Sequence, residues 1–534
     1  MARRVRYAVS AAVREVRAGL GLAALLRQPP APMAGPEEEM RARVARRAEN
    51  FLWSVEHLIF AYPDSPYRPL LEVAGYDLPR VRHLVMTLGL DAALDRLWQD
   101  GVYVRIQEFK GREPVTRHGR TFRFHERAFA NPAAPGVLRG RSSGSRSGGT
   151  QTEVSTDDLI YHARLLSWLL DEYGLRERDV VVWLTPGAGL ERIVRFSLAG
   201  HRPLQWFSPV GFIGRATPLM LAVARAAGSG YLPRLRVVPP ERVLEVARYI
   251  ARVNTRRGLL VAAFVNSALR LVLTAEEAGV ALGDVAFLLL GEPVTPVKRR
   301  QIEARGFTVV PRFGFFELGE PAWACPSPRE SDDLHVLTDM VVLRQYPRVV
   351  DRDGTTVPAY LFTTLLPHAR HVMLNLETGD YGGLEERSCG CFLERAGLRL
   401  HMHTIRSFEK LTAEGITFLG PGIIDLLEEV LPRTFGGDSR HYQLVEGEDA
   451  RGFTKLYLLA SPCLGPLDEA ALRRTLLEEL GERHLHPAYG RSAATVWRQA
   501  DTVRVLRRDP LPTAAGKVLH LHRVSGAVIE AGGG

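Results

Sequence analysis

Residues 141–150 read Arg141-Ser142-Ser143-Gly144-Ser145-Arg146-Ser147-Gly148-Gly149-Thr150, and the interpretation of the fold depends on them. The run combines small hydroxyl and glycine residues with two guanidinium groups. Such a loop can turn its backbone N–H groups inward and present hydroxyls and positive charge to phosphate oxygens. Ser/Gly-rich decapeptides are more often flexible linkers, so the run by itself leaves both interpretations open.

The flanking sequence favours a phosphate-binding turn. Residues 131–136 are rich in turn-forming residues, and Val137-Leu138 is a short extended piece. Downstream, Ser155-Thr156-Asp157-Asp158 has the pattern of a capping box that opens a helix over residues 159–173. A linker is not usually held between an extended piece and a capped apolar helix.

Two familiar motifs nearly match this loop, and neither fits. Gly144 and Gly149 have the spacing of a Walker A loop, but Thr150 stands where the phosphate-binding lysine belongs. Residues 140–144 match G-x-S-x-G, yet a nucleophile elbow needs a strong strand before it and a helix directly after it.

Composition and charge restrict the class of protein. A chain of 534 residues, 46% apolar and 24% charged, predicts a soluble globular protein of roughly two or three domains. The net charge of +9 favours anionic ligands such as nucleotides or CoA. The sequence contains no RNA-binding signature and no zinc-finger spacing, so we expect no nucleic-acid partner.

Cysteine usage and hydropathy bear on location. Four cysteines are too few for a disulfide scaffold and predict a reducing, cytoplasmic setting. No apolar run is long enough for a transmembrane segment. Residues 1–26 form a basic amphipathic segment, for which a helix docked on its own domain is favoured over contact with a membrane surface.

Periodicity predicts an α/β fold with three regions. Residues 1–130 predict a helical entry region of the large domain, with strands at 102–109 and 121–124. Strands and helices then alternate to about residue 320, which indicates a mostly parallel sheet covered by helices. The predicted strands are 179–184, 234–238, 259–264, 285–291 and 308–312, and the predicted helices 218–227, 241–256 and 296–305.

After residue 330 strands predominate, at 335–343, 348–350 and 360–365, with a hairpin turn at Asp353-Gly354. A change near 405 begins an α+β segment with helices at 422–431 and 467–480 and strands at 442–445 and 454–459. The predicted boundaries are therefore 1–130, 131–404 for the core with its β-rich subdomain, and 405–534 for a C-terminal lid domain.

Five motifs occur in a characteristic order. They are the loop 142–150, Gly291-Glu292-Pro293, Phe313-Gly314-Phe315-Phe316-Glu317, Thr378-Gly379-Asp380 and Leu511-Pro512-Thr513-Ala514-Ala515-Gly516-Lys517. Together they resemble the adenylate-forming superfamily, closest to its phenylacetate–CoA ligase-like branch, from about residue 135 to 525. The resemblance implies a large N-terminal domain with helix-covered, mostly parallel sheets and a β-rich subdomain, plus a small mobile α+β C-terminal domain.

The resemblance also implies roles for individual residues. The loop would hold the phosphates of ATP, Glu317 would help to hold Mg²⁺, and Gly291, Glu292 and Pro293 would flank the adenine with Phe313 and Gly314 nearby. Asp380 would accept hydrogen bonds from both ribose hydroxyls. Arg406 would contact ribose or phosphate, and Lys517 would neutralise charge in the adenylate-forming transition state. The C-terminal domain would rotate about Glu409-Lys410.

The chain departs from the family pattern in four places. Residues 145–147 replace threonine and lysine, and Phe316 replaces a hydroxyl residue before the glutamate. Leu376-Glu377 replaces an arginine, and Ile405 replaces a glycine. Taken singly, each motif also fits an ordinary turn or an exposed lysine; taken jointly, the motifs favour adenylation.

Cys325, His335, Cys389 and Cys391 suggest a structural zinc site, because three thiolates and one imidazole satisfy tetrahedral zinc. Three reduced cysteines beside a surface histidine remain the alternative, since the spacing is not that of a standard finger. We interpret Cys463 as a core thiol.

The sequence thus predicts an acid–thiol ligase that uses ATP and Mg²⁺ to activate a carboxylic acid and passes it to CoA or a phosphopantetheine thiol. The resemblance places the acid pocket between residues 185 and 320, where an apolar lining that includes Trp206, Phe207, Phe212 and Phe264 would favour an aryl or fatty acid. Delivery to a carrier protein or an amine, and a non-catalytic nucleotide-binding relative, are the alternatives. A small carboxylic acid is the expected partner, with an acyl carrier protein and a second copy of the chain as options left open.

Overall fold

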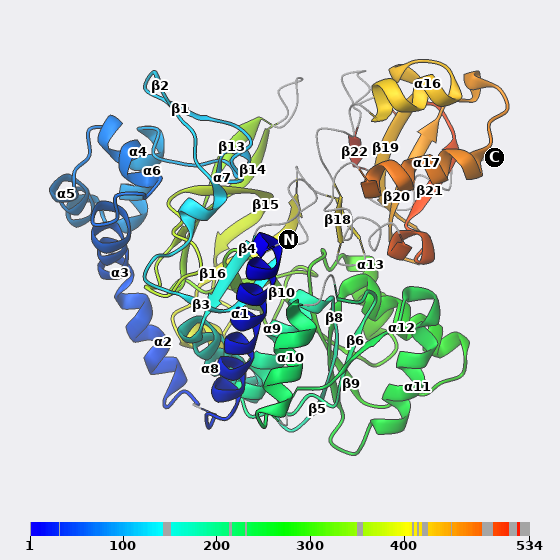
Figure 1. Ribbon diagram of the computed structural model, residues 1–534, viewed down its shortest axis with the longest axis horizontal. Helices are drawn as coiled ribbons and strands as arrows, with labels where there is room; N and C mark the ends of the chain where they lie inside the picture. The colour runs from blue at the N-terminus through cyan, green and yellow to red at the C-terminus, as the bar shows by residue number, and fades with distance from the viewer. Residues whose placement is uncertain are drawn as a thin grey trace.

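The computed structural model describes most of the chain (Figure 1). The described residues are 2–30, 32–141, 151–212, 216–229, 232–349, 356–407, 411–413, 416–418, 426–449, 451–482, 495–511 and 521–523. The loop 142–150, the turn at Asp353-Gly354, the pair Glu409-Lys410 and Lys517 lie outside the described residues.

The centre of the protein is a twelve-stranded sheet, of which one half is parallel in the order β10-β9-β8-β5-β6-β7. Its strands are β5 (Asp179–Trp183), β6 (Gln205–Ser208), β7 (Leu235–Val237), β8 (Leu259–Phe264), β9 (Val285–Leu290) and β10 (Thr308–Phe315). The chain builds outward from β5 to β7, then returns to place β8 on the other side of β5. This reversal is a topological switch point, beyond which α/β sheets bind ligands.

Helices cover both faces of this half. They are α8 (Thr156–Glu172), α9 (Pro186–Leu198), α10 (Ala216–Ala226), α11 (Val243–Val253), α12 (Val265–Glu277) and α13 (Pro296–Glu303). Alternate residues of β5 enter different cores: Val180 and Val182 join one buried cluster, and Val181 joins another. Burial on both faces explains why such strands are continuous apolar runs.

The other half of the sheet is antiparallel, in the order β11-β12-β16-β15-β14-β13 from its junction with β10. Its strands are β11 (Gly319–Ala324), β12 (Leu334–Val336), β13 (Val341–Val349), β14 (Thr356–Thr364), β15 (Leu376–Glu386) and β16 (Leu400–Ser407). The short helix α14 (Phe392–Arg395) lies between β15 and β16. Strand β10 belongs to both halves, since it pairs in parallel with β9 and in antiparallel with β11.

The N-terminal region is helical, as the sequence predicts. Its helices are α1 (Ala2–Leu26), α2 (Pro36–Ala45), α3 (Arg47–Ser54), a π-helical turn (Val55–Phe60), α4 (Tyr67–Val73), α5 (Leu78–Leu88), α6 (Leu90–Gln99) and α7 (Ile106–Phe109). Helix α1 lies beside α10 (Figure 1). A Cβ at Gly19 would come within 2.5 Å of the Met220 carbonyl oxygen, so only glycine allows this close approach.

One predicted strand is wrong. Residues 102–109 make only an isolated bridge at Val104 and then enter α7, where the Glu108 carboxylate accepts a hydrogen bond from the Arg105 amide at 2.8 Å. That cap competes with extended backbone. The next predicted strand is present as β2 (Arg120–Phe122), paired with β1 (Val115–Arg117).

The predicted capped helix is confirmed as α8. The side chain of Ser155 accepts a hydrogen bond from the Asp158 amide at 3.2 Å. Strands β3 (Gly136–Arg141) and β4 (Gln151–Ser155) pair in antiparallel on either side of residues 142–150. The decapeptide therefore connects the two strands of a hairpin that feeds directly into a capped helix.

A smaller unit with its own core follows the large sheet, at the upper right of Figure 1. Its mixed sheet has the order β21-β20-β19-β22. The separate two-stranded pair of β17 (Leu411–Ala413) and β18 (Ile416–Phe418) precedes this unit in the chain. The elements of the unit are a π-helical turn (Leu426–Val430), α16 (Leu431–Phe435), β19 (Tyr442–Glu448), β20 (Thr454–Ala460), α17 (Glu469–Glu482), β21 (Val503–Arg507) and β22 (Leu521–Arg523).

Short 3-10 turns at Glu126–Phe129, Pro240–Arg242, Ser439–His441 and Pro462–Leu464 complete the described elements. The architecture confirms the predicted fold class, a helix-covered sheet with a β-rich part and a small α+β unit. Within the described residues, no helix combines the length and apolar character needed to cross a membrane. Cys463, which we predicted to be a core thiol, is exposed on a turn.

Candidate active site and metal centre

The predicted adenine-flanking motif forms the turn after β9. Gly291 has φ +81°, and a Cβ there would lie 2.8 Å from the Phe264 ring, so this turn requires glycine. The Glu292 carboxylate accepts a hydrogen bond at 2.7 Å from the backbone N–H of Asn266, which lies in the first turn of α12. A carboxylate at a helix N-terminus is favourable. This contact fixes the turn, including Pro293, at the edge of the sheet next to the switch point.

The next motif ends β10, the neighbour of β9. A Cβ at Gly314 would approach the Gly319 carbonyl oxygen to 2.4 Å, because the β10–β11 pair shifts register there. The Phe313 ring stacks on Phe362 with centroids 6.2 Å apart. Since β9 and β10 are parallel neighbours, their following turns lie at the same edge of the sheet.

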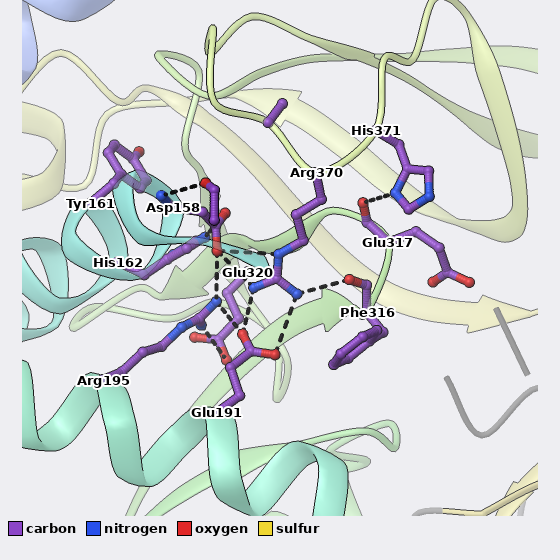
Figure 2. A network of polar contacts seen from close by, with 12 residues as sticks. Asp158, Tyr161, His162, Glu191, Arg195, Phe316, Glu317, Glu320, Arg370 and His371 are labelled. Atoms are coloured by element: carbon purple, nitrogen blue, oxygen red, sulfur yellow. Dashed lines mark hydrogen bonds and ion pairs between the residues drawn. The ribbon is translucent and has the colours of Figure 1, made fainter. Parts of the chain in front are cut away.

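The turn that carries Glu317 is held by two side chains from one distant loop (Figure 2). The Arg370 Nη1 donates to the Phe316 carbonyl oxygen at 2.8 Å, and the His371 Nδ1 donates to the Glu317 carbonyl oxygen at 3.0 Å. Burial lowers the pKa of His371 to about 4, so its ring is neutral at pH 7. A neutral ring that donates from Nδ1 fixes this backbone without adding charge.

The Glu317 carboxylate is paired with a lysine that the sequence did not single out. The Lys110 Nζ lies 2.5 Å from Glu317 Oε1, and the two side chains are 11% and 9% exposed. Lys110 follows α7, and 207 residues separate it from Glu317. No local pattern marks Lys110, because its partner is set by the packing of α7 against the sheet.

Behind this turn lies a buried ionic cluster, formed by Asp158, Glu191, Arg195, Glu320 and Arg370 (Figure 2). The Arg370 guanidinium contacts Asp158 at 2.9 Å and Glu191 at 2.5 Å. Burial by itself would raise the pKa of Glu191, but Arg195 and Arg370 outweigh it and hold that pKa at about 2. Glu191 is therefore kept ionised behind the Phe316–Glu317 backbone.

The same cluster extends to β10. One oxygen of Glu320 accepts from Arg312 at 2.5 Å and also contacts Arg192, both of which are buried. Sequence reasoning identified Asp158 only as part of a helix cap and missed the other residues. Most of them stand among apolar neighbours on ordinary helices and strands, and Arg370 lies in a loop, so no spacing identifies them as partners.

The two residues predicted to contact the ribose lie on adjacent antiparallel strands. The register pairs Asp380 of β15 with Ser407, and Arg406 of β16 with Tyr381. Because side chains alternate along a strand, Asp380 and Arg406 project from opposite faces of this pair. The Arg406 guanidinium instead lies 3.5 Å from Asp332. Asp380 is 8% exposed at this edge.

The aromatic residues of the predicted acid pocket do not share one face. Trp206 and Phe264 belong to one buried cluster, whereas Phe207 packs in another, against Tyr249 of α11. The rings of Trp206 and Phe212 pack edge to face with their centroids 5.6 Å apart. Because successive side chains of a strand point to opposite faces of the sheet, Phe207 does not share a surface with Trp206.

The structure brings the four predicted zinc ligands together. Ligand atoms of Cys325, His335, Cys389 and Cys391 all lie within 4.8 Å of one another. The His335 Nε2 is 3.5 Å from the Cys389 sulfur and 3.2 Å from the Cys391 sulfur. Ligand distances in tetrahedral zinc predict about 3.6 Å between sulfur and nitrogen.

The surroundings orient these ligands as zinc sites require. The His335 Nδ1 donates to the Leu398 carbonyl at 2.7 Å, which leaves Nε2 facing the sulfurs. The Glu394 carboxylate accepts from the amides of Cys389 and Gly390 at 2.8 and 2.6 Å. The hydrogen bond with Cys325 and the contact with His335 lower the pKa of Cys391 and favour its thiolate form, while the same hydrogen bond raises the pKa of Cys325.

Comparison with solved structures identifies the architecture. The structure of a 2-hydroxyisobutyryl-CoA ligase, in complex with its acyl-AMP and CoA in the thioester-forming state, matches with a TM-score of 0.52 and 16% identity. The match covers 92% of this chain and 91% of that one. The chain shares the fold of that CoA ligase. At this identity the likeness concerns the fold alone.

A second similar structure is the o-succinylbenzoate CoA synthetase of Bacillus subtilis, with a TM-score of 0.40 and 14% identity over 73% of this chain and 69% of that one. No protein-family model matches the chain, and no curated protein matches it.

Proposed function

We propose that this protein activates a carboxylic acid, aryl or fatty, with ATP to give an acyl-adenylate, and then transfers the acyl group to a thiol, most directly that of CoA. The observation that carries the proposal is the position of two motifs. On the fold shared with that CoA ligase, the turn that begins at Gly291 and the turn that carries Glu317 follow the neighbouring parallel strands β9 and β10, at the edge where the carboxyl ends of the strands meet.

The first step forms a bond between a carboxylate oxygen and the α-phosphorus of ATP, and breaks the bond from that phosphorus to pyrophosphate. The loop 142–150 would bind the departing phosphates. The carboxylate of Glu317 is an oxygen donor of the kind that Mg²⁺ prefers, and bound Mg²⁺ would neutralise phosphate charge. Lys517, from the C-terminal domain, would stabilise the negative charge that develops at the α-phosphate.

In the second step a thiolate attacks the acyl carbon, and AMP leaves with the electrons of the acyl–oxygen bond. Movement of the C-terminal domain about Glu409-Lys410 would withdraw Lys517 and admit the thiol. ATP–pyrophosphate exchange with a panel of aryl and fatty acids tests the first step. A thioester assay with CoA, a phosphopantetheine-bearing carrier protein and an amine as separate acceptors tests the second.

A non-catalytic nucleotide-binding relative is the second candidate. Phe316 removes a hydroxyl next to Glu317, and the Glu317 carboxylate is paired with Lys110 rather than exposed. Binding of ATP without pyrophosphate exchange for any acid in the panel would favour this function over ligation.

Asp380 provides a test of the nucleotide site. We expect Asp380→Asn to raise the KM for ATP by about 10-fold to 100-fold, because hydrogen bonds from the ribose hydroxyls to a charged group are worth about 1.5–3 kcal/mol. Exchange kinetics at varied ATP measure this change. Ser407→Ala is the control, since Ser407 pairs with Asp380 across the strands and its hydroxyl donates to the Gly379 carbonyl oxygen. An equal rise of KM in both variants would assign the effect to the strand pair.

We also propose that the Cys325, His335, Cys389 and Cys391 cluster binds one structural zinc ion. Elemental analysis of protein purified without chelator is expected to find one zinc per chain. Cys391→Ser is expected to retain less than about a tenth of it, because tetrahedral sites need all four ligands. Cys463→Ser, at an exposed cysteine outside the cluster, should retain zinc fully. Metal-free wild-type protein, or retention by Cys391→Ser, would contradict the assignment.

A further inference from the structure

The contact between Lys110 and Glu317 places an ammonium on the carboxylate that the proposed reaction needs for its divalent cation. Lys110 Nζ is 2.5 Å from Glu317 Oε1. Both side chains are about nine-tenths buried. A divalent ion at Glu317 would therefore compete with a cation of this chain for the same oxygen atom.

The lysine is held in place from its own side. Phe109, which precedes it, is fully buried, and its ring centroid lies 4.7 Å from that of Phe129 and 5.6 Å from that of His371. Glu108 forms two hydrogen bonds with Arg117, at 3.0 and 2.9 Å. The backbone that carries Lys110 is therefore fixed, and only its side chain can move.

The carboxylate is held from the other side by Arg370 and His371, which bind the backbone of Phe316 and Glu317. A third charge lies near the pair. Burial raises the pKa of Glu126, while Lys110 lowers it and Glu317 raises it. Removing the ammonium would leave these two carboxylates without that cation and would make the site more attractive to a divalent ion.

We propose that Lys110 is a positioning residue that occupies the Glu317 carboxylate in the nucleotide-free protein and releases it when a divalent cation arrives with the nucleotide. A mostly buried ammonium displaced from its carboxylate needs another anion nearby. The phosphates of the nucleotide supply that anion. Metal binding at Glu317 is then coupled to nucleotide binding, because the phosphates bring an anion for the displaced lysine and the metal ion alone does not.

This inference rests on the proposed function, in which Glu317 helps to hold the Mg²⁺ that accompanies ATP. It is independent of the residues of the loop 142–150, whose sequence carries Arg146 and no lysine.

The test is the affinity of nucleotide-free, full-length protein for Mn²⁺, measured by electron paramagnetic resonance as loss of the free-ion signal. Lys110→Gln is expected to bind Mn²⁺ at least about tenfold more tightly than the wild type, since a competing charge is removed. Lys110→Arg keeps the charge and should bind as weakly as the wild type. The double variant Lys110→Gln/Glu317→Gln should lose the whole gain.

Lys298→Gln is the matched control, because Lys298 is also buried but pairs with Glu448 and Thr454. It should leave Mn²⁺ affinity unchanged. Equal affinity of Lys110→Gln and wild type, or a gain that survives Glu317→Gln, would overturn the proposal. Circular dichroism checks the fold, and Lys110→Met replaces Lys110→Gln if the latter is misfolded.

The two proposals fail separately. If Lys110→Gln gains Mn²⁺ affinity through Glu317 but no acid supports pyrophosphate exchange, the competition between lysine and metal is supported and the ligase activity is rejected. Acid-dependent exchange with no change of Mn²⁺ affinity in Lys110→Gln would retain the activity and reject the competition.

Discussion

Replacement of Lys517 by alanine is expected to lower the rate of ATP–pyrophosphate exchange by about 10²-fold to 10³-fold, the loss typical of removing one preorganised donor from a developing negative charge. Lys517 lies outside the described residues, and its role follows from the motif at 511–517. The ammonium is needed while the α-phosphate carries extra charge, so the maximal rate should fall much more than the affinity for ATP.

The second half-reaction provides the control. Thioester formation from supplied acyl-adenylate should remain within a few-fold of the wild-type rate in Lys517→Ala, because the lysine is proposed to leave the site for that step. Lys517→Arg retains the charge and tests whether the compact ammonium is required. An exchange rate unaffected by Lys517→Ala would remove this residue from the mechanism.

Replacement of Arg370 by methionine is expected to lower the free energy of unfolding by about 3–5 kcal/mol, because breaking a buried ion pair leaves uncompensated charge. Arg370 contacts Asp158 and Glu191 and also holds the Phe316 carbonyl. Its loss would leave the two carboxylates and the Phe316 carbonyl without this partner. Urea unfolding of the full chain, followed for the large domain by tryptophan fluorescence, measures the change.

An exposed ion pair provides the comparison for Arg370. Arg440→Met removes a contact with Asp438 in which the arginine side chain is 84% exposed, and it should lower the free energy of unfolding far less than Arg370→Met does, because exposed ion pairs contribute little. Arg370→Lys retains one charge and should fall between the two. If Arg370→Met proves no more destabilising than Arg440→Met, the buried cluster does not stabilise the fold.

The same variant alters acid stability in a defined direction. Arg195 and Arg370 hold the pKa of Glu191 at about 2, below its ordinary value of 4.5. Glu191 therefore contributes stability that is fully present above pH 4.5 and is lost as the pH falls toward 2. Without Arg370 the pKa of Glu191 rises, so less stability remains to be lost in that window. A shallower decline in Arg370→Met below pH 4.5 is the expected result.

Most of the fold could be predicted from local patterns. The continuous apolar runs of β5, β8 and β9 and the Ser155 cap of α8 follow from burial and capping, which act over a few residues. The exception, residues 102–109, shows the limit of such patterns. A single carboxylate at Glu108 caps a helix there and outweighs β-type composition.

The candidate sites divide in the same way. The glycine turns at Gly291 and Gly314 and the four zinc-type ligands could be recognised from residue type and order, because the chemistry restricts which residues serve. The prediction that Trp206 and Phe207 line a common pocket was wrong, because these neighbouring residues of β6 face opposite cores. Apolar character alone does not show which face of a strand a residue occupies.

The sequence by itself determined the parallel half of the sheet, the capped helix, the order of the motifs and the identity of the Cys₃His quartet. Only the tertiary structure decided that Lys110 pairs with Glu317 across 207 residues, and that Arg370 reaches Asp158 across 212. Periodicity and capping record whether a residue is buried or ends a helix. Pairing between charges depends on which elements the sheet order makes neighbours, and no local pattern in the chain encodes that order.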